Sequence, residues 1–171
     1  MSMRNRQRGF SLIEALVGFL ILSVGMLGIA SLQTLSLKAG NTASLRSVAV
    51  IKASEIIERM RSNPTQLAAY NVSTGDSGTD NGCNDSTGTA VLCVPAAMAA
   101  DDIFNWKNDL KSALPNNNNT TASIVVTPPG AGQALTNITV TINWQERATD
   151  ASTMVEQNYT VSTQMCGAIT C

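Results

Sequence analysis

The chain has 171 residues and a formal net charge of −1, and its length accommodates one globular domain in addition to a terminal anchor. It contains no histidine, which excludes histidine-based acid–base catalysis and histidine ligation of metals. Its 11 basic and 12 acidic residues give none of the basic excess that is typical of a nucleic-acid-binding protein.

A basic leader opens the chain and is followed by a long apolar segment. Three arginines lie within residues 1–8, the dipeptide Gly9-Phe10 follows, and residues 15–37 contain no charged side chain. About 20 apolar residues are enough to cross the hydrocarbon core of a bilayer as a helix. The sequence therefore predicts a membrane-spanning helix whose basic end stays in the cytoplasm.

One carboxylate, that of Glu14, lies at the start of this apolar segment. A charged group at membrane depth costs on the order of a few kcal/mol and usually has a functional partner. Cleavage of the chain after Gly9 would create such a partner, because the new α-amino group of Phe10 is positively charged. That amine could pair with Glu14 of the same chain or of a neighbouring copy.

Two other interpretations of the N-terminus are an uncleaved membrane anchor and an ordinary secretory signal. Gly28-Ile29-Ala30 is a small-x-small site of the kind that a general signal peptidase accepts, and a secreted chain would then begin at Ser31. The acid inside the apolar segment disfavours the secretory signal, since its charge would cost free energy there and a secretory signal has no use for it.

The segment 9–14, Gly-Phe-Ser-Leu-Ile-Glu, followed by an apolar helix, resembles the class III signal of type IV pilins and pseudopilins. The resemblance implies that a prepilin peptidase cleaves after Gly9 and methylates the new N-terminus at Phe10. It also implies that Glu14 is the acid used in subunit assembly. The implied partners are this peptidase, the inner membrane and its pilus assembly machinery, the major pilin and other minor pilins. No cofactor, metal or catalytic residue follows from it.

The helix is expected to continue beyond the membrane as an amphipathic segment. Asn63-Pro64 predicts its end, because the residue before proline avoids the α region. The predicted organisation is a leader over residues 1–9, a long helix over residues 10–63 and a periplasmic head over residues 64–171. The apolar stripe of the second half recurs at three- and four-residue steps at Leu45, Ala49, Ala53, Ile56 and Met60.

Four cysteines in an exported head predict disulfides, with three possible connectivities. The local pairs, Cys83 with Cys93 and Cys166 with Cys171, are favoured. A zinc site is the competing interpretation, and the absence of any C-x-x-C pair disfavours it.

Residues 71–90 are rich in Ser, Thr, Gly, Asn and Asp and predict a long surface loop. Asp76, Asp80 and Asp85 leave calcium binding open as an alternative. Their spacing does not match an EF-hand, so a solvated loop is the favoured interpretation.

A short helix and three strands are predicted after this loop. Residues 101–114 have helical spacing, with Asp101 or Asp102 as the N-cap and Trp106 in the core. The strands are predicted within the β-branched or alternating segments 123–127, 137–144 and 155–164. The resulting fold class is α+β and pilin-like: a long N-terminal helix packed on a small antiparallel β-meander head with a short extra helix.

A narrower resemblance, to the PilV family of minor pilins, rests on the helix end Glu58-Arg59-Met60-Arg61-Ser62-Asn63, the short helix around Trp106 and the strand that ends in Trp144. It implies a minor type IV pilin that primes pilus assembly, sits in the pilus or at its tip, and supports twitching motility, adhesion or DNA uptake. A pseudopilin of a type II secretion system is the alternative, because the N-terminal motif is shared. A tethered enzyme is disfavoured, since no nucleophile elbow, phosphate loop or meaningfully spaced carboxylate pair occurs.

Overall fold

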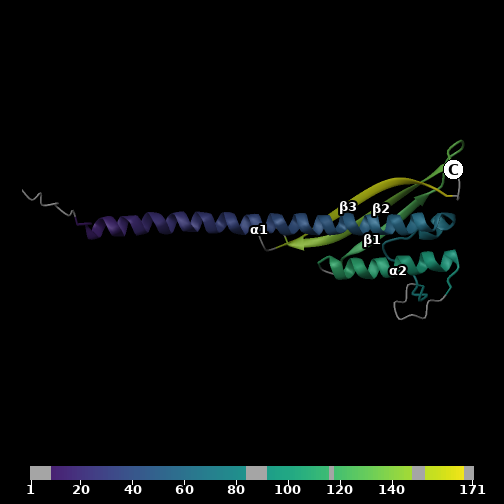
Figure 1. Ribbon diagram of the computed structural model, residues 1–171, viewed down its shortest axis with the longest axis horizontal. Coiled ribbons are helices and arrows are strands. Elements are labelled where there is room, and N and C mark those ends of the chain that lie inside the picture. The colour runs from purple at the N-terminus through teal and green to yellow at the C-terminus, as the bar shows by residue number, and fades with distance from the viewer. Residues whose placement is uncertain (1–8, 84–91, 116–117, 148–152, 168–171) are drawn as a thin grey trace, which may run out of the picture. The chain divides into compact units, whose positions relative to one another are not determined.

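The computed structural model describes residues 9–83, 92–115, 118–147 and 153–167 (Figure 1). The chain divides into two compact units, Met1–Asn41 and Thr42–Cys171. Helix α1, Leu12–Ser62, contributes residues to both units.

The first unit consists, over its described part, of the apolar portion of α1. Its large hydrophobic side chains are exposed, among them Phe19 at 72% and Leu27 at 72%. The mean hydropathy of an 18-residue window reaches 2.3, and none of that window is buried inside the protein. By length and composition, α1 is the one helix among the described residues that is suited to cross a membrane.

The second unit is built on a three-stranded antiparallel sheet with the order β1-β2-β3. Strand β1 covers Thr121–Thr127, β2 covers Leu135–Arg147 and β3 covers Met154–Cys166. Alternate residues of β2 are buried, because successive side chains of a strand point to opposite faces. The predicted meander is thus confirmed, and each strand extends further than the alternation alone indicates.

The core of the second unit lies between the sheet and its helices. The C-terminal part of α1 buries Ala49, Ala53, Ile56, Ile57 and Met60, which include four members of the predicted stripe. Trp106, Trp144 and Tyr70 are the largest fully buried side chains. The indole Nε1 of Trp106 donates to the backbone oxygen of Lys52 at 2.8 Å, which fixes α2 against α1. Trp106 is therefore a core aromatic, as its helical spacing predicts.

Helix α2 covers Pro95–Ala113, and the N-cap predicted at Asp101 or Asp102 is wrong. The helix begins about two turns earlier, with Val94 as N-cap and Pro95 in the first turn, where proline is well tolerated. The alanine-rich segment that follows favours the helix but offers no apolar periodicity. A 3₁₀ helix, η1 (Pro64–Tyr70), connects the end of α1 to the following segment.

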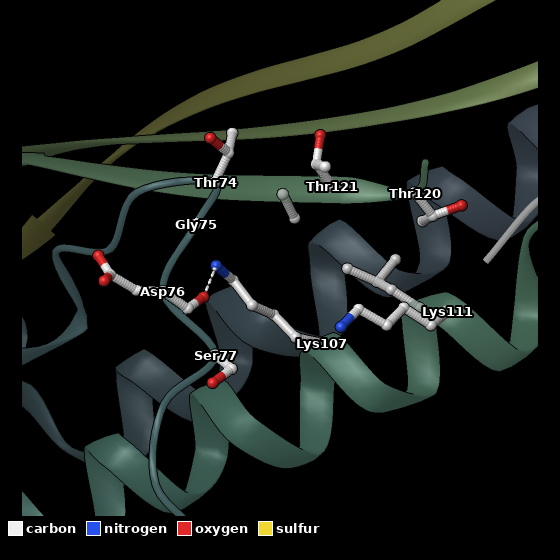
Figure 2. Close-up of a pocket in the computed structure, with 10 residues that line it drawn as sticks. Thr74, Gly75, Asp76, Ser77, Lys107, Lys111, Thr120 and Thr121 are labelled. Carbon is white, nitrogen blue, oxygen red and sulfur yellow. Dashed lines mark hydrogen bonds between the residues drawn. The ribbon is translucent and has the colours of Figure 1, made fainter. Parts of the chain in front are cut away.

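The first part of the predicted surface loop is fastened to the head rather than free. Val72 and Ile124 exchange two backbone hydrogen bonds of 2.9 Å each. The ammonium group of the buried residue Lys107 donates to the backbone oxygen of Ser73 at 2.6 Å. It also donates to the backbone oxygen of Asp76 (Figure 2). Burial lowers the pKa of Lys107, an effect that the nearby Asp76 carboxylate partly offsets. The remainder of this segment, residues 84–91, lies outside the described residues.

Candidate processing and assembly site

The proposed cleavage junction is exposed and lies just before a helix. Residues 9–11 are not helical, and the Phe10 side chain is 81% exposed. A Cβ atom added at Gly9 would meet no heavy atom within 4 Å. A peptidase must bind its substrate backbone in an accessible form, and the Gly9-Phe10 bond fulfils this requirement.

Ser11 caps the N-terminus of α1. Its Oγ accepts the backbone N–H of Glu14 at 3.2 Å, and its backbone oxygen accepts N–H groups of Glu14 and Ala15. The order Ser-x-x-Glu is the pattern of a capping box. A carboxylate in the first turn is also favourable, because the helix dipole is positive there.

The Ser11 cap is not among the features predicted from the sequence, although the Ser-x-x-Glu spacing that indicates it occurs at residues 11–14. In this cap the backbone N–H of Glu14 is the donor to the Ser11 side chain.

The polar side chains of the apolar segment are satisfied within their own helix. The hydroxyl groups of Ser23, Ser31 and Thr34 donate to backbone oxygens three or four residues earlier, at 2.8 to 3.0 Å. Hydrogen-bonding groups inside a bilayer must find such partners, because no water is present there. These residues therefore do not prevent α1 from entering a membrane.

Small residues leave parts of this helix surface open to close approach. A Cβ atom built at Gly18, Gly25 or Gly28 would meet no atom within 4 Å outside the local helix backbone. Gly18 and Gly25 are seven residues apart and share a face. Such glycines allow two helices to pack closely in a membrane or in a bundle.

The carboxylate of Glu14 has no cation within salt-bridge distance among the described residues, which begin at Gly9. Five ion pairs join two described residues each, and these five lie in the second unit. The described residues therefore supply no counter-charge for the Glu14 carboxylate.

The structure joins Cys83 to Cys93, with Cα atoms 5.7 Å apart. Cys166 is also disulfide-bonded, whereas its predicted partner, Cys171, lies outside the described residues. Asp101 supports the first disulfide, because its Oδ1 accepts the backbone N–H groups of Asn81, at 2.8 Å, and of Cys83, at 3.3 Å.

Two models of known families match consecutive parts of the chain. The model described as "Prokaryotic N-terminal methylation motif" matches residues 4–30, and the model described as "Type IV pilin Tt1218" matches residues 31–104. The chain belongs to the type IV pilin family. No significant match to it was found among curated proteins or solved structures.

The fold of this chain agrees with its membership of the pilin family. A long N-terminal helix, a three-stranded antiparallel sheet and a short helix form the expected α+β pilin-like fold. The first match covers the leader's arginines and the Gly9-Phe10 junction, and the second reaches from the apolar helix into α2. The family is structural rather than catalytic and implies other pilins and an assembly machinery as partners.

Two of the three aspartates that could bind calcium accept hydrogen bonds from residues close to them in the chain. The Asp76 carboxylate accepts hydrogen bonds from the backbone and hydroxyl of Ser73, and Asp80 accepts one from the backbone of Gly82. Asp85 lies outside the described residues. Among the residues that the structure describes, no group of three potential metal ligands comes together.

Proposed function

We propose that this pilin is a minor subunit of the PilV type, which helps to prime pilus assembly and becomes incorporated in the pilus or at its tip. Before assembly its head lies in the periplasm and its apolar helix in the inner membrane; afterwards it lies at the cell surface. In this role it supports twitching motility, adhesion or DNA uptake, through other minor pilins and the major pilin.

The observation that carries the processing and assembly part of this proposal is the combination of the methylation motif with the exposed Gly9-Phe10 junction and the lone carboxylate of Glu14. The PilV assignment rests on the resemblance of residues 58–63, of the helix around Trp106 and of the strand that ends in Trp144. We propose that residues 1–9 are removed, that Phe10 is methylated, and that residues 10–63 and 64–171 act as helix and head. Helix–helix contact along the apolar segment supplies most of the stabilisation in the filament.

In this mechanism Glu14 of one subunit pairs with the Phe10 amine of its neighbour. Two opposite charges in a medium of low dielectric attract strongly and are little screened by salt. A shifted packing would leave both charges buried and unpaired, at a cost of several kcal/mol. The ion pair thus favours one axial register of the helices over other registers that have similar apolar contacts.

Two measurements test the proposal. The mass of the N-terminal peptide of the membrane-bound protein should correspond to methylated Phe10; a peptide that begins at Ser31 or retains the leader would contradict processing at Gly9. Proteins that co-purify with the full chain should be components of a type IV pilus. Recovery of type II secretion components instead would assign the chain to the pseudopilins, which share the N-terminal motif.

A further inference from the structure

The Ser11 cap ends α1 directly beside the Gly9-Phe10 bond. The backbone nitrogen of Glu14 lies 3.2 Å from the Oγ of Ser11 and 3.1 Å from its backbone oxygen. The backbone N–H of Ala15 donates to the same oxygen at 3.3 Å, in the regular pattern of an α-helix. Residues 9–11 therefore keep a non-helical backbone.

The cap engages a donor that a longer helix would need. In an α-helix each N–H bonds to the carbonyl four residues earlier. If α1 extended towards the leader, the Glu14 N–H would bond to the Phe10 carbonyl and the Ile13 N–H to the Gly9 carbonyl. The Gly9 carbonyl belongs to the peptide bond that we propose is cleaved. Because the Ser11 side chain accepts the Glu14 N–H, it competes directly with this extension.

The sequence on both sides of the junction favours a longer helix. Three arginines and one glutamine, all good helix formers, occur within residues 4–8. Gly9 weakens a helix but does not terminate one. The first turn of α1 opens an apolar segment, and N–H groups near hydrocarbon need acceptors within the protein. Without the Ser11 hydroxyl, the carbonyls in helical position are those of Gly9 and Phe10.

A peptide bond inside a helix is a poor substrate for a peptidase. Its carbonyl accepts a hydrogen bond, and the neighbouring turn shields the peptide group from attack. Such a bond must first unwind locally, so the rate of cleavage falls with the population of the unwound form. The non-helical residues 9–11, with Phe10 largely exposed, make this step unnecessary.

We propose that Ser11 is a positioning residue for removal of the leader: its side chain ends α1 and thereby keeps the Gly9-Phe10 bond non-helical and accessible. This inference rests on the proposed cleavage after Gly9. The reaction is hydrolysis of one amide: water adds to the Gly9 carbonyl carbon, the bond to the Phe10 nitrogen breaks, and that nitrogen leaves as an amine. Ser11 touches none of the reacting atoms and acts through the backbone conformation. The rate of processing should therefore follow the capping strength of residue 11, not the presence of a hydroxyl group.

Cleavage of capping variants by a purified prepilin peptidase tests this inference. The full precursor, in detergent or in vesicles, is incubated with the peptidase, and the ratio of precursor to mature chain is followed on a gel. Ser11→Asn keeps a strong neutral cap without a hydroxyl group and should be cleaved at nearly the parent rate. Ser11→Ala should be cleaved about fivefold more slowly, the factor that corresponds to loss of a typical cap. Ser23→Ala is the matched control, because it removes a hydroxyl group of the same helix that donates to the Leu20 oxygen, and should leave the rate unchanged.

Backbone chemical shifts give a second readout that does not involve the enzyme. The ¹³C shifts of Gly9 and Phe10, measured on the uncleaved precursor in micelles, distinguish a helical from an extended backbone. They should move towards helical values in Ser11→Ala and stay at the parent values in Ser11→Asn. A direct contact between the Ser11 hydroxyl and the peptidase would instead lower the rate without moving these shifts.

The outcomes separate this inference from the proposed function. A parent chain that is not cleaved after Gly9 would contradict the proposed processing, and this inference with it. If the parent chain is cleaved there, parent-like cleavage of Ser11→Ala or slow cleavage of Ser11→Asn would overturn the role of the cap alone. Unchanged shifts of Gly9 and Phe10 in Ser11→Ala would also overturn it.

Discussion

Glu14 lies in the first turn of α1 and carries the charge that we propose for assembly, and substitutions can separate the two features. Its position in the Ser11 cap contributes to the start of α1, whereas its charge is proposed to contact the neighbouring subunit. Glutamine at this position is also compatible with a capping box but is neutral. The contribution of charge to assembly can therefore be measured without disturbing the helix start.

We expect Glu14→Gln and Glu14→Ala to insert into the membrane but to be depleted from sheared pili to a similar, large extent. Each leaves the Phe10 amine of a neighbour buried without its partner, a cost of roughly 3–5 kcal/mol. The measurement is the ratio of the subunit in pili to that in the inner membrane. Glu58→Gln, at an exposed pair with Arg61 on the same helix, is the control. Normal incorporation of Glu14→Gln would show that the cap, not the charge, is what matters.

Gly9 allows processing to be tested without a confounding effect on folding. A Cβ atom there meets nothing within 4 Å, so Gly9→Leu should leave the fold intact. It should block cleavage and give a precursor that is longer by the leader, visible on a gel and by mass. Gly40→Leu, at another open position, should be processed normally. A mature-sized product from Gly9→Leu would place the cleavage site elsewhere.

At the scale of elements, the contact between α1 and α2 depends on buried charges. Asp102 is 6% exposed, and its carboxylate accepts hydrogen bonds from the Tyr70 hydroxyl at 2.7 Å and from Arg59 at 3.1 Å. Burial raises the pKa of the Tyr70 phenol, and the Asp102 carboxylate raises it further. The phenol therefore stays protonated as a donor over the physiological range.

We expect Asp102→Ala to lower the free energy of unfolding by roughly 3 kcal/mol, because it leaves Arg59 and the Tyr70 hydroxyl without their acceptor. Asp109→Ala on the same helix is the control. Its side chain is 50% exposed and its oxygen lies 3.4 Å from Lys52, so the loss should stay below about 1 kcal/mol. Chemical denaturation of both variants measures the difference. Equal losses would mean that the buried network adds nothing beyond an exposed ion pair.

The Glu55 carboxylate predicts a pH dependence of stability. Burial opposes its ionisation, but hydrogen bonds from Lys52 and Arg59 outweigh this effect and lower its pKa below the ordinary 4.5. A lowered pKa in the folded state means that the stabilisation is complete above about pH 4.5 and is lost as pH falls through the folded value. In denaturation series from pH 6 to pH 3, Glu55→Gln should therefore lose less stability on acidification than the parent chain. A slope equal to that of the parent would contradict the assignment.

The helices show what periodicity can and cannot predict. The end of α1 and its buried stripe follow from Asn63-Pro64 and from apolar spacing, and both are observed. α2 begins earlier than the sequence predicts, because alanines carry no amphipathic pattern and the acids at 101 and 102 resemble a cap. Those acids instead bind distant backbone and side-chain groups, and such tertiary partners cannot be read from a single sequence.

At the scale of the whole molecule, the sequence predicts which helices and strands form the head better than it predicts the contacts between them. Spacing predicts the three strands and the long helix, because a two-residue period and a 3.6-residue period are local properties. It does not reveal that Lys107 holds the 73–76 segment or that Val72 closes the edge of β1. Those contacts bring together residues far apart in the chain, and their energy depends on burial that only the fold creates.

The division into units predicts where the pilin can be cut without loss of the head. Every residue of the hydrophobic core lies after Thr42, and the described large apolar residues before it are exposed. A chain beginning at Thr42 should therefore be folded and water-soluble, with the same cooperative thermal transition as the head of the full chain.

A chain beginning at Pro64 loses the five buried α1 side chains and the Lys52 oxygen that accepts the Trp106 indole. Removal of these groups opens the core over the sheet, at a cost of several kcal/mol for each large side chain. This shorter chain should show no cooperative transition by near-ultraviolet circular dichroism. A cooperative transition in it would mean that the sheet and α2 are stable without α1.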